Sequence, residues 1–430
     1  MAADAIVHFS VLAKDDDIII IRRNMMNYIL MAIPVFFVLI LLELAWAYYK
    51  KKEVFRLNDS INSLSMGFMS RVTQILYAAV PFSFYVYFYE DFALFEWQSN
   101  AWTWIAAFVL YDFSYYWVHR IGHTMNISWA SHVIHHSSEE YNLTTALRQT
   151  SVPNVIGWVF YIPLAFMGFP PIVLVTVGSL NLIYQFWIHT QAIDQMPRWY
   201  EFLFVTPSNH RVHHAKNKIY VDKNFSGVFL WDRLFGTYQP ELKEEKVIFG
   251  ISTPLASWNP VWGNLHFLAS LCQDAWRTKS WKDKFTLWFR RTGYRPADVE
   301  EAHPVKKSNQ AAEKYDTPLS TMAKWYALSQ LTIVSVGILL FMLNVGSFTL
   351  QQNMIVGLSF AFCLYSLGAF QESQSHAMIM ELLKYTLLVA NLIWIVPAAP
   401  WLALLTLCMG IVSIIWLYAI QKQSSTMHTA

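Results

Sequence analysis

The protein has 430 residues, of which 55% are hydrophobic and only 14% are charged. About a quarter of the residues in a soluble chain are usually charged, so this composition excludes a set of water-exposed domains, and it also excludes disorder, collagen and a coiled coil. The 31 basic and 29 acidic residues nearly cancel, which leaves no overall field that favours nucleic acid. An aromatic content of 17% is typical of chains whose helices end at a bilayer interface. The sequence therefore predicts an all-α, polytopic integral membrane protein.

Nine segments are candidate spanning helices, since roughly 20 mainly apolar residues cross about 30 Å of hydrocarbon. They are 27–49, 65–89, 101–118, 152–168, 171–190, 322–343, 353–371, 381–397 and 400–420. The segments predict a division of the chain into domains. It comprises a polar lead at 1–26, a histidine-rich membrane domain at 27–294 with its motif core at 112–239, a polar linker at 295–321 and a C-terminal transmembrane bundle at 322–430 without a chemical motif.

Prolines and positive charges predict the topology. The run Gly168-Phe169-Pro170-Pro171 cannot continue a helix, so the segments on its two sides form a hairpin, and the loops 119–151 and 191–321 share one side of the membrane. By the same counting Lys50-Lys51-Lys52 lies on that side, and basic loop residues favour the cytoplasm. We expect a protein of the endoplasmic reticulum or the bacterial inner membrane with both loops in the cytoplasm.

Eight of the 14 histidines fall into three boxes. The boxes are His119-x3-His123, His132-x2-His135-His136 and His210-x2-His213-His214. On a helix these spacings place the imidazoles on one face, where they can ligate one metal ion or two adjacent ions. Eight rings exceed the three or four that one zinc ion takes, so two metals sharing the set is the economical interpretation. Imidazole suits Zn, Cu, Fe and Ni alike, and spacing alone does not name the ion.

Further polar residues in the neighbouring spans fit the same centre. Asp112 lies two helical turns before His119, and an ionisable residue inside a spanning segment is functional by default. We expect its carboxylate to accept the second ring N–H of a ligating histidine; the alternative is a hydrogen bond between helices. Asn181, Gln185 and His189 recur every four residues as a polar stripe. This stripe makes His189 a candidate ninth ligand and the two amides candidate catalytic residues.

The three boxes in this order resemble the fatty acid hydroxylase/sterol desaturase superfamily of membrane di-iron oxygenases, over about Asp112 to Gln239. Two stretches, Trp129–Gln149 and Asn209–Thr237, are similar to the alkylglycerol monooxygenase branch in particular. One position departs from that branch, which usually has Glu directly after the second histidine of the first box. This chain has Thr124 there.

The resemblance implies a lipid monooxygenase with two iron ions on the boxed histidines, O2 as oxidant and a substrate drawn from the bilayer. Cleaving an unactivated C–H bond needs an oxidant that no side chain supplies, so the metal carries that step while protein groups hold geometry and exclude water. In the ether-lipid case, hydroxylation of the carbon beside the ether oxygen gives a hemiacetal. The hemiacetal breaks down to a fatty aldehyde and a glycerol lipid.

The resemblance also implies tetrahydrobiopterin as a reductant. Carboxylates accept the N–H groups of a pterin well, and Glu139 and Glu140 follow the second box, so we expect them, with Thr124 and Arg148, near the cofactor. Alternatively both glutamates are solvated or bind Arg148. The sequence has no fused cytochrome domain and no Gly-x-Gly-x-x-Gly motif, so we expect electrons from a separate donor or a diffusible pterin.

Two other functions stay open on the residues alone. A sterol or fatty-acid hydroxylase or desaturase would use the same di-iron centre on another lipid. A histidine-based metal transporter or sensor would use the rings as a relay, but transporter sites usually lie near the bilayer midplane between internal repeats. Here the boxes follow the ends of spanning segments, and the sequence shows no repeat.

Overall fold

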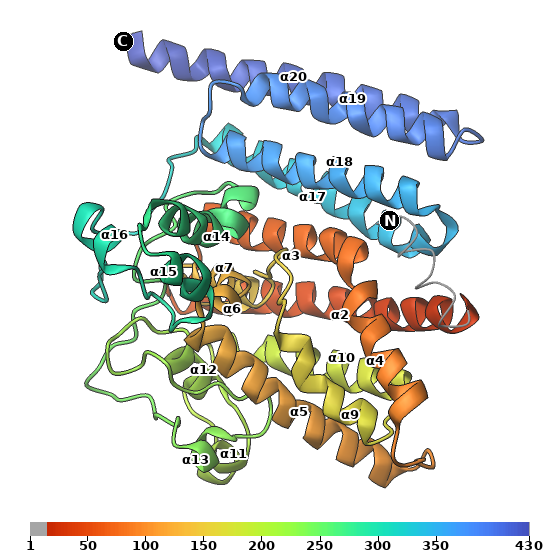
Figure 1. The fold of residues 1–430 in the computed structure, drawn as a ribbon. Helices are drawn as coiled ribbons and strands as arrows, with labels where there is room; N and C mark the ends of the chain where they lie inside the picture. Colours follow the sequence, from red (N-terminus) through yellow and green to blue (C-terminus); the bar gives the residue numbers. More distant parts are fainter. Residues whose placement is uncertain (1–14, 430) are drawn as a thin grey trace. The chain divides into compact units, whose positions relative to one another are not determined.

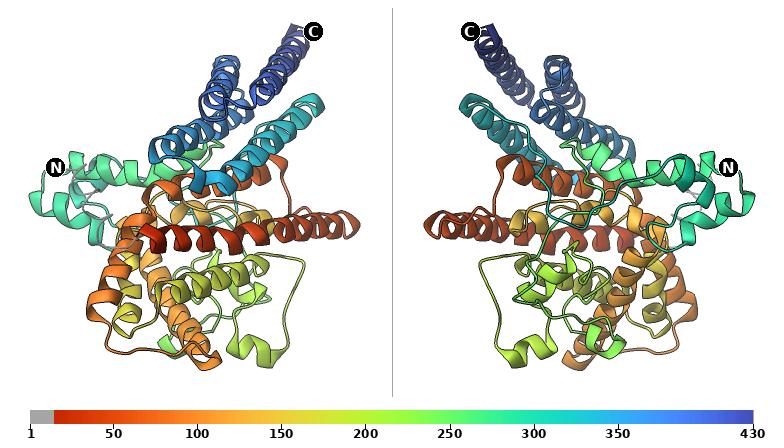
Figure 2. Two further views of the ribbon diagram at one scale, coloured as in Figure 1. Left: turned by 90° about the vertical axis from the view of Figure 1, so that its right-hand side faces the viewer. Right: turned by 90° about the vertical axis from the view of Figure 1, so that its left-hand side faces the viewer.

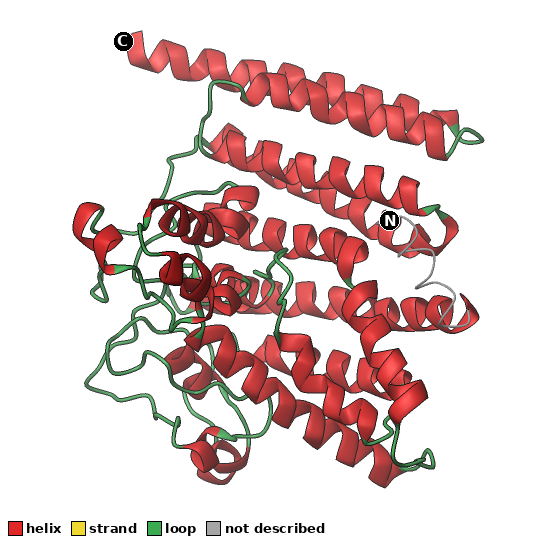
Figure 3. Ribbon diagram, in the orientation of Figure 1, coloured by secondary structure: helices red, strands yellow, loops and turns green. Residues whose placement is uncertain are grey.

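A computed structural model describes the backbone of residues 15–429 and the side chains of residues 28–423. Over these residues the chain is helical and forms no strand, which confirms the predicted all-α class (Figure 3). The nearest approach to a sheet is two isolated bridges, Phe204 with Phe229 and Ala215 with Phe249.

The chain forms two compact units. Unit 1 comprises Met1–Phe55, Tyr77–Leu255 and Asn264–Glu313, and unit 2 comprises Arg56–Leu76, Ala256–Gly263 and Lys314–Ala430. All histidine boxes lie in unit 1. The division into four domains at 1–26, 27–294, 295–321 and 322–430 stays a prediction.

Unit 1 is built from a few long helices and many short ones (Figure 1). The long helices are α2 (Asp15–Tyr49), α4 (Ala79–Phe92), α5 (Ala101–Thr124) and α10 (Pro171–Trp187), together with most of α14 (Pro260–Arg277). The short helices are α6 (Asn126–Ala130), α7 (Val133–His136), α8 (Leu143–Ala146), η1 (Gly157–Tyr161), α9 (Ile162–Phe166), α11 (Arg198–Leu203), α12 (Pro207–His213), α13 (Asp232–Phe235), α15 (Trp281–Thr286), η2 (Leu287–Phe289) and α16 (Ala297–Ala302). Helix α2 lies alongside α10 (Figure 2).

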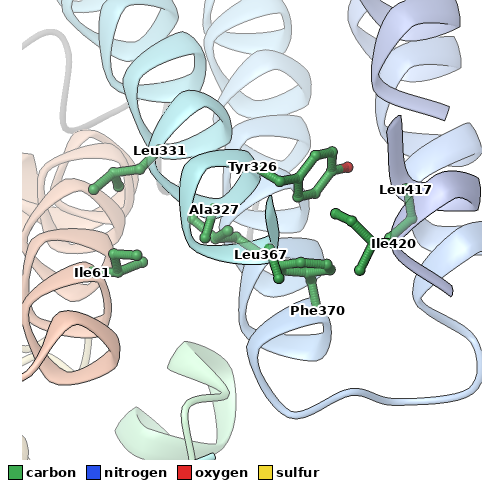
Figure 4. Close-up of a cluster of buried hydrophobic side chains, with 9 residues drawn as sticks. Ile61, Tyr326, Ala327, Leu331, Leu367, Phe370, Leu417 and Ile420 are labelled. Atoms are coloured by element: carbon green, nitrogen blue, oxygen red, sulfur yellow. The ribbon is translucent and has the colours of Figure 1, made fainter. Parts of the chain in front are cut away.

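Unit 2 is a bundle of long helices with an apolar core. Its helices are α3 (Leu57–Tyr77), α17 (Thr321–Asn344), η3 (Val345–Ser347), α18 (Leu350–Gln371), α19 (Ala377–Ile395) and α20 (Pro400–Thr429). Ile61 of α3, Tyr326 of α17, Phe370 of α18 and Leu417 of α20 meet in one buried cluster (Figure 4).

Five helices among the described residues are long and apolar enough to cross a membrane, so the chain is an integral membrane protein. They cover Tyr28–Tyr49, Thr321–Ser347, Leu350–Gln371, Ala377–Ile395 and Pro400–Gln423. The predicted number of nine is not confirmed. The predicted span 65–89 is divided at Ala78 between α3 and α4. The predicted span 152–168 forms only η1 and α9, whose ten residues cover about half of the hydrocarbon thickness.

The turn between α9 and α10 requires its glycine. Gly168 has a φ of +84°, and a Cβ atom there would lie 1.8 Å from the carbonyl oxygen of Phe95. Only glycine adopts this backbone conformation without steric cost and lets a second backbone segment approach so closely. Pro170 and Pro171 then start α10, as expected of prolines at the first turn of a helix.

Candidate metal centre

The nine histidines named from the sequence gather at the ends of α5 and α10 in two buried groups. The five-histidine group consists of His119, His123, His132, His136 and His213, and the four-histidine group consists of His135, His189, His210 and His214. Within each group the ring nitrogens that can act as ligands lie within 4.8 Å of one another. Two imidazole nitrogens on opposite sides of one ion are about 4.2 Å apart at a metal–nitrogen distance of about 2.1 Å. Each group therefore has the dimensions of one metal site.

Helical spacing explains how the boxes are shared between the groups. The three pairs at i and i+4 each stay together: His119 with His123, His132 with His136, and His210 with His214. Residues four apart differ by about 40° around a helix, whereas neighbours differ by about 100°. The middle histidines of the second and third boxes, His135 and His213, thus turn to the opposite group. Each three-histidine box therefore contributes to both groups.

The protonation of the rings shows that the groups fit cations. Nδ1 of His135 lies 3.1 Å from the carbonyl oxygen of Arg148, and Nδ1 of His189 lies 2.7 Å from that of Gln185. A carbonyl oxygen only accepts, so both Nδ1 atoms carry the proton and both Nε2 atoms present a lone pair. These two Nε2 atoms are 3.2 Å apart. Two facing lone pairs repel each other unless a cation lies between them, and this is the arrangement that a metal ion requires.

The five-histidine group has the same character. Nε2 of His119 lies 3.0 Å from Nε2 of His132, although Nδ1 of His119 donates to the carbonyl oxygen of Phe225 at 2.6 Å. Nε2 of His123 and Nε2 of His213 are buried and have no hydrogen-bond partner among the described residues. Such orphaned polar atoms are rare in native interiors. Burial also lowers the pKa of His135 to about 4, so that ring is neutral at physiological pH, which is the form that binds a metal.

A short loop between α12 and α13 orients two of the ligands. His119 donates to Phe225 and His213 to Lys223, at 2.6 and 3.1 Å. The flanking Asp222 and Asn224 have positive φ angles of 59° and 55°, a conformation in which Asn and Asp are favoured over other side chains. Because residues with positive φ alternate with ordinary ones, the carbonyl oxygens of Lys223 and Phe225 point to the rings of His213 and His119.

Asp232 fixes the same loop. Its carboxylate oxygens accept the backbone N–H groups of Phe225 and Ser226 at 2.8 and 2.9 Å, and Asp232 is fully buried. Both Asn224 and Asp232 belong to the stretch that resembles the alkylglycerol monooxygenase branch. The sequence singled out that stretch without giving these residues a role, because their contacts are to backbone groups that no motif spacing reveals.

The structure gives Asp112 different partners from the predicted one. Its carboxylate accepts the side-chain N–H of Asn181 at 2.6 Å, and the backbone N–H groups of Val228 and Phe229 and the indole N–H of Trp231, each at 2.9 Å. Backbone carbonyl oxygens accept from Nδ1 of four histidines instead, namely His119, His135, His189 and His213. The predicted alternative, a contact that joins helices, is closer to what is found, because Asp112 of α5 binds α10 and the strand-like segment before α13.

The predicted polar stripe on α10 is continuous. Gln185 donates to the side-chain oxygen of Asn181 at 2.6 Å and accepts from the hydroxyl of Tyr115 at 2.8 Å. The backbone carbonyl of Gln185 holds His189. The stripe thus connects Asp112 to the four-histidine group through contacts that position side chains.

The residues expected near a pterin lie around the second box, and Arg148 lies behind it. Arg148 is buried, and its Nε donates to the carbonyl oxygen of Ile134 at 3.1 Å and to the hydroxyl of Ser137 at 3.0 Å. Its side chain therefore supports the second box from behind. The hydroxyl of Thr124 donates to the carbonyl oxygen of Arg120 one turn earlier in α5. Glu139 is half-buried and Glu140 is buried.

Two charged residues next to the centre were missed in the sequence. Arg211, between two ligands of the third box, binds Glu241 through two nitrogens and donates to the carbonyl oxygens of Thr190, Ile193 and Asp194. Glu43 is buried in the spanning helix α2. Glu43 could have been found, since it is the one acidic residue in the segment 27–49 and an ionisable residue in a span indicates a function.

Comparisons with known proteins agree with this site. The family model for fatty acid hydroxylase matches residues 104–237. The alkylglycerol monooxygenase of Homo sapiens is 41% identical over 274 residues, which cover 63% of this chain and 60% of the human protein. The match to the alkylglycerol monooxygenase of Xenopus tropicalis likewise spans 60% of that protein, at 39% identity.

The match to a third relative covers nearly the whole chain. The alkylglycerol monooxygenase of Danio rerio is 34% identical over 413 residues, which cover 92% of this chain and 89% of the relative. No solved structure matches the chain significantly. The histidine groups and the family match together indicate iron binding, and the extent of the Danio rerio match settles the relationship: this chain belongs to the alkylglycerol monooxygenase family.

Proposed function

We propose that this protein is a di-iron lipid monooxygenase that hydroxylates the ether-linked alkyl chain of alkylglycerols. The observation that carries the proposal is the pair of adjoining histidine groups, in which the Nε2 lone pairs of His135 and His189 face each other at 3.2 Å. Five and four neutral imidazoles would hold one ion each. Iron bound there would supply the activation of O2, while the side chains hold the ligands in place and exclude water.

The substrate class rests on the relatives and on the position of the groups. The relatives are named for alkylglycerols, and the groups lie where α5 and α10 end, next to the apolar helix α2. An alkyl chain could reach the site from the bilayer without entering water. One oxygen atom would enter the C–H bond beside the ether oxygen and the other would leave as water, with two electrons from a reductant. The resulting hemiacetal would divide into a fatty aldehyde and a glycerol lipid.

The reductant is proposed to be tetrahydrobiopterin, with Glu139 or Glu140 accepting its N–H groups. Both lie within four residues of the second box, and a carboxylate offers two acceptor oxygens where Thr124 offers one hydroxyl. A separate protein donor is the alternative. We further propose that the histidine groups face the cytoplasm, in keeping with Lys50, Lys51 and Lys52 at the end of α2.

One experiment tests the function. The purified protein in lipid nanodiscs is assayed for iron content and for O2 uptake with an alkylglycerol, with and without tetrahydrobiopterin, and the products are identified by mass spectrometry. We expect two iron ions per chain and a fatty aldehyde formed in step with O2 uptake. A hydroxylated or unsaturated sterol or fatty acid, with no aldehyde from the ether lipid, would instead favour the sterol or fatty-acid enzyme that the family model leaves open.

A further inference from the structure

The first spanning helix buries a carboxylate on the face that it turns towards the rest of unit 1. Glu43 exposes only 4% of its surface and shares this face of α2 with Phe36, Ile40 and Ala47. Phe36 stacks on Phe186 of α10 with ring centroids 4.0 Å apart. An ionisable side chain within a membrane segment is costly and is kept where it makes a specific contact.

Both oxygens of Glu43 accept hydrogen bonds from segments that carry histidines. One oxygen accepts the backbone N–H of Leu143 at 2.7 Å, at the start of α8. The other accepts the hydroxyl of Thr190, the residue directly after His189. One side chain of α2 thus joins the turn that follows the second box to the end of α10.

The two segments continue to other members of the four-histidine group. Helix α8 leads within a few residues to Arg148, whose carbonyl oxygen orients His135. The carbonyl oxygen of Thr190 accepts from Arg211 at 3.1 Å, and Arg211 follows His210 in α12. Short chains of hydrogen bonds and neighbouring residues therefore link Glu43 to three of the four histidines, His135, His189 and His210.

We infer that Glu43 is a positioning residue for the metal ion of the four-histidine group, an inference that rests on the proposed di-iron function. Without the carboxylate, the N–H of Leu143 and the hydroxyl of Thr190 would be buried without their acceptor, which is unfavourable. The segments holding His135 and His189 would then separate. Their Nε2 atoms are 3.2 Å apart, so a shift of a fraction of this distance changes how well they bind one ion.

The test is metal affinity in the full-length protein in nanodiscs. Glu43→Gln replaces one oxygen by an amide NH2 group, so one of the two hydrogen bonds is lost and two donors then face each other. We expect one of the two irons to bind 10–100-fold more weakly in chelator competition, the range typical of residues that orient metal ligands, and the other to change less than about twofold. Mössbauer spectra of the 57Fe protein should lose one of two iron signals. Thr190→Val, which removes one contact without setting two donors against each other, should shift the same iron in the same direction by less.

The control is Tyr85→Phe, which removes another buried hydrogen bond of unit 1, from the Tyr85 hydroxyl to the carbonyl oxygen of Phe169 at 2.8 Å. It should leave both irons in place. Unchanged affinity for both irons in Glu43→Gln and Thr190→Val would overturn the inference and leave the di-iron function standing. Equal weakening of both irons would also overturn it. A wild-type protein that binds no second metal would refute the di-iron function itself.

Discussion

His136 and His214 stack their rings at a centroid distance of 4.3 Å and an interplanar angle of 21°, although they belong to different histidine groups. The two groups are therefore adjacent, with a ring of one in direct contact with a ring of the other. We therefore first predict the effect of removing one histidine on both groups.

Replacement of a histidine from a box that contributes to both groups should affect both metals. His213→Ala removes a ring of the five-histidine group that comes from the same box as two ligands of the other group. We expect loss of turnover and an iron content well below two per chain, measured by elemental analysis. His303→Ala, at an exposed histidine outside the boxes, is the control and should keep both. Full activity and two irons in His213→Ala would refute the shared arrangement.

Asp112→Asn should weaken the site without abolishing it. The substitution puts an amide NH2 group where the carboxylate now accepts two of its four hydrogen bonds, so donor would face donor. We expect activity or metal affinity to fall 10–100-fold, as for other groups that support metal ligands indirectly. Asp91→Asn, at an exposed position of α4, should have no effect. A variant as active as the wild type would show that this carboxylate does not support the centre.

The pterin proposal has its own test. If Glu139 or Glu140 accepts the N–H groups of tetrahydrobiopterin, its replacement by Gln should raise the pterin concentration needed for half-maximal turnover about 10–100-fold, the equivalent of one hydrogen bond to a charged group. Glu244→Gln, at an exposed glutamate, serves as the control. Turnover supported by a ferredoxin or cytochrome, with no response to pterin, would contradict the proposal and leave the iron site untouched.

The membrane topology can be tested by cysteine labelling. In a background with Cys272 and Cys408 replaced by Ser, single cysteines are placed at Lys52, Lys218 and Ser99, which are all exposed. An impermeant maleimide should label the first two from the cytoplasmic side and the third from the opposite side. Labelling of residues 52 and 218 from opposite sides would refute the predicted hairpin.

Gly168→Ala should destabilise the protein strongly. A left-handed backbone costs a non-glycine residue roughly 1–2 kcal/mol, and the new Cβ would meet the carbonyl oxygen of Phe95 at 1.8 Å. We expect a loss of more than about 2 kcal/mol, seen as a Tm several degrees lower in thermal unfolding in detergent. Gly346→Ala, where a Cβ meets nothing within 4 Å, should leave the Tm nearly unchanged. Equal Tm values for the two variants would show that the turn can rearrange.

The sequence predicted the gathering of the histidines better than the scaffold that holds them. Spacing at i and i+4 places two rings on one helical face whatever the tertiary fold, so pairs such as His119 with His123 could be identified at once. Which boxes join which group, with His189 beside parts of the second and third boxes, is a tertiary property. The partners of Asp112 could not be predicted either, because three of its four donors come from residues 228–231, more than a hundred positions along the chain.

The predicted number of spanning helices is not confirmed, because hydropathy does not measure helix length. Residues 152–168 are apolar, but Pro153, Asn154, Pro163 and Gly168 interrupt the helix and leave η1 and α9. Glu43 shows that a residue can be noticed in a sequence while its contacts cannot be predicted. Its presence in a span could have indicated a role, but its two partners, Leu143 and Thr190, were not identifiable from spacing.

The shortness of the helices that carry the ligands has a consequence for the biogenesis of the enzyme. Helix α7 has four residues and α12 has seven, and isolated helices of this length are not stable in water. They form only when the chain between positions 119 and 232 has been synthesised and packed against α5 and α10. The newly made protein is therefore expected to enter the membrane without metal and to acquire iron late, after the third box has left the ribosome. A cell short of iron would then accumulate inserted but inactive protein that later iron supply can activate without new synthesis.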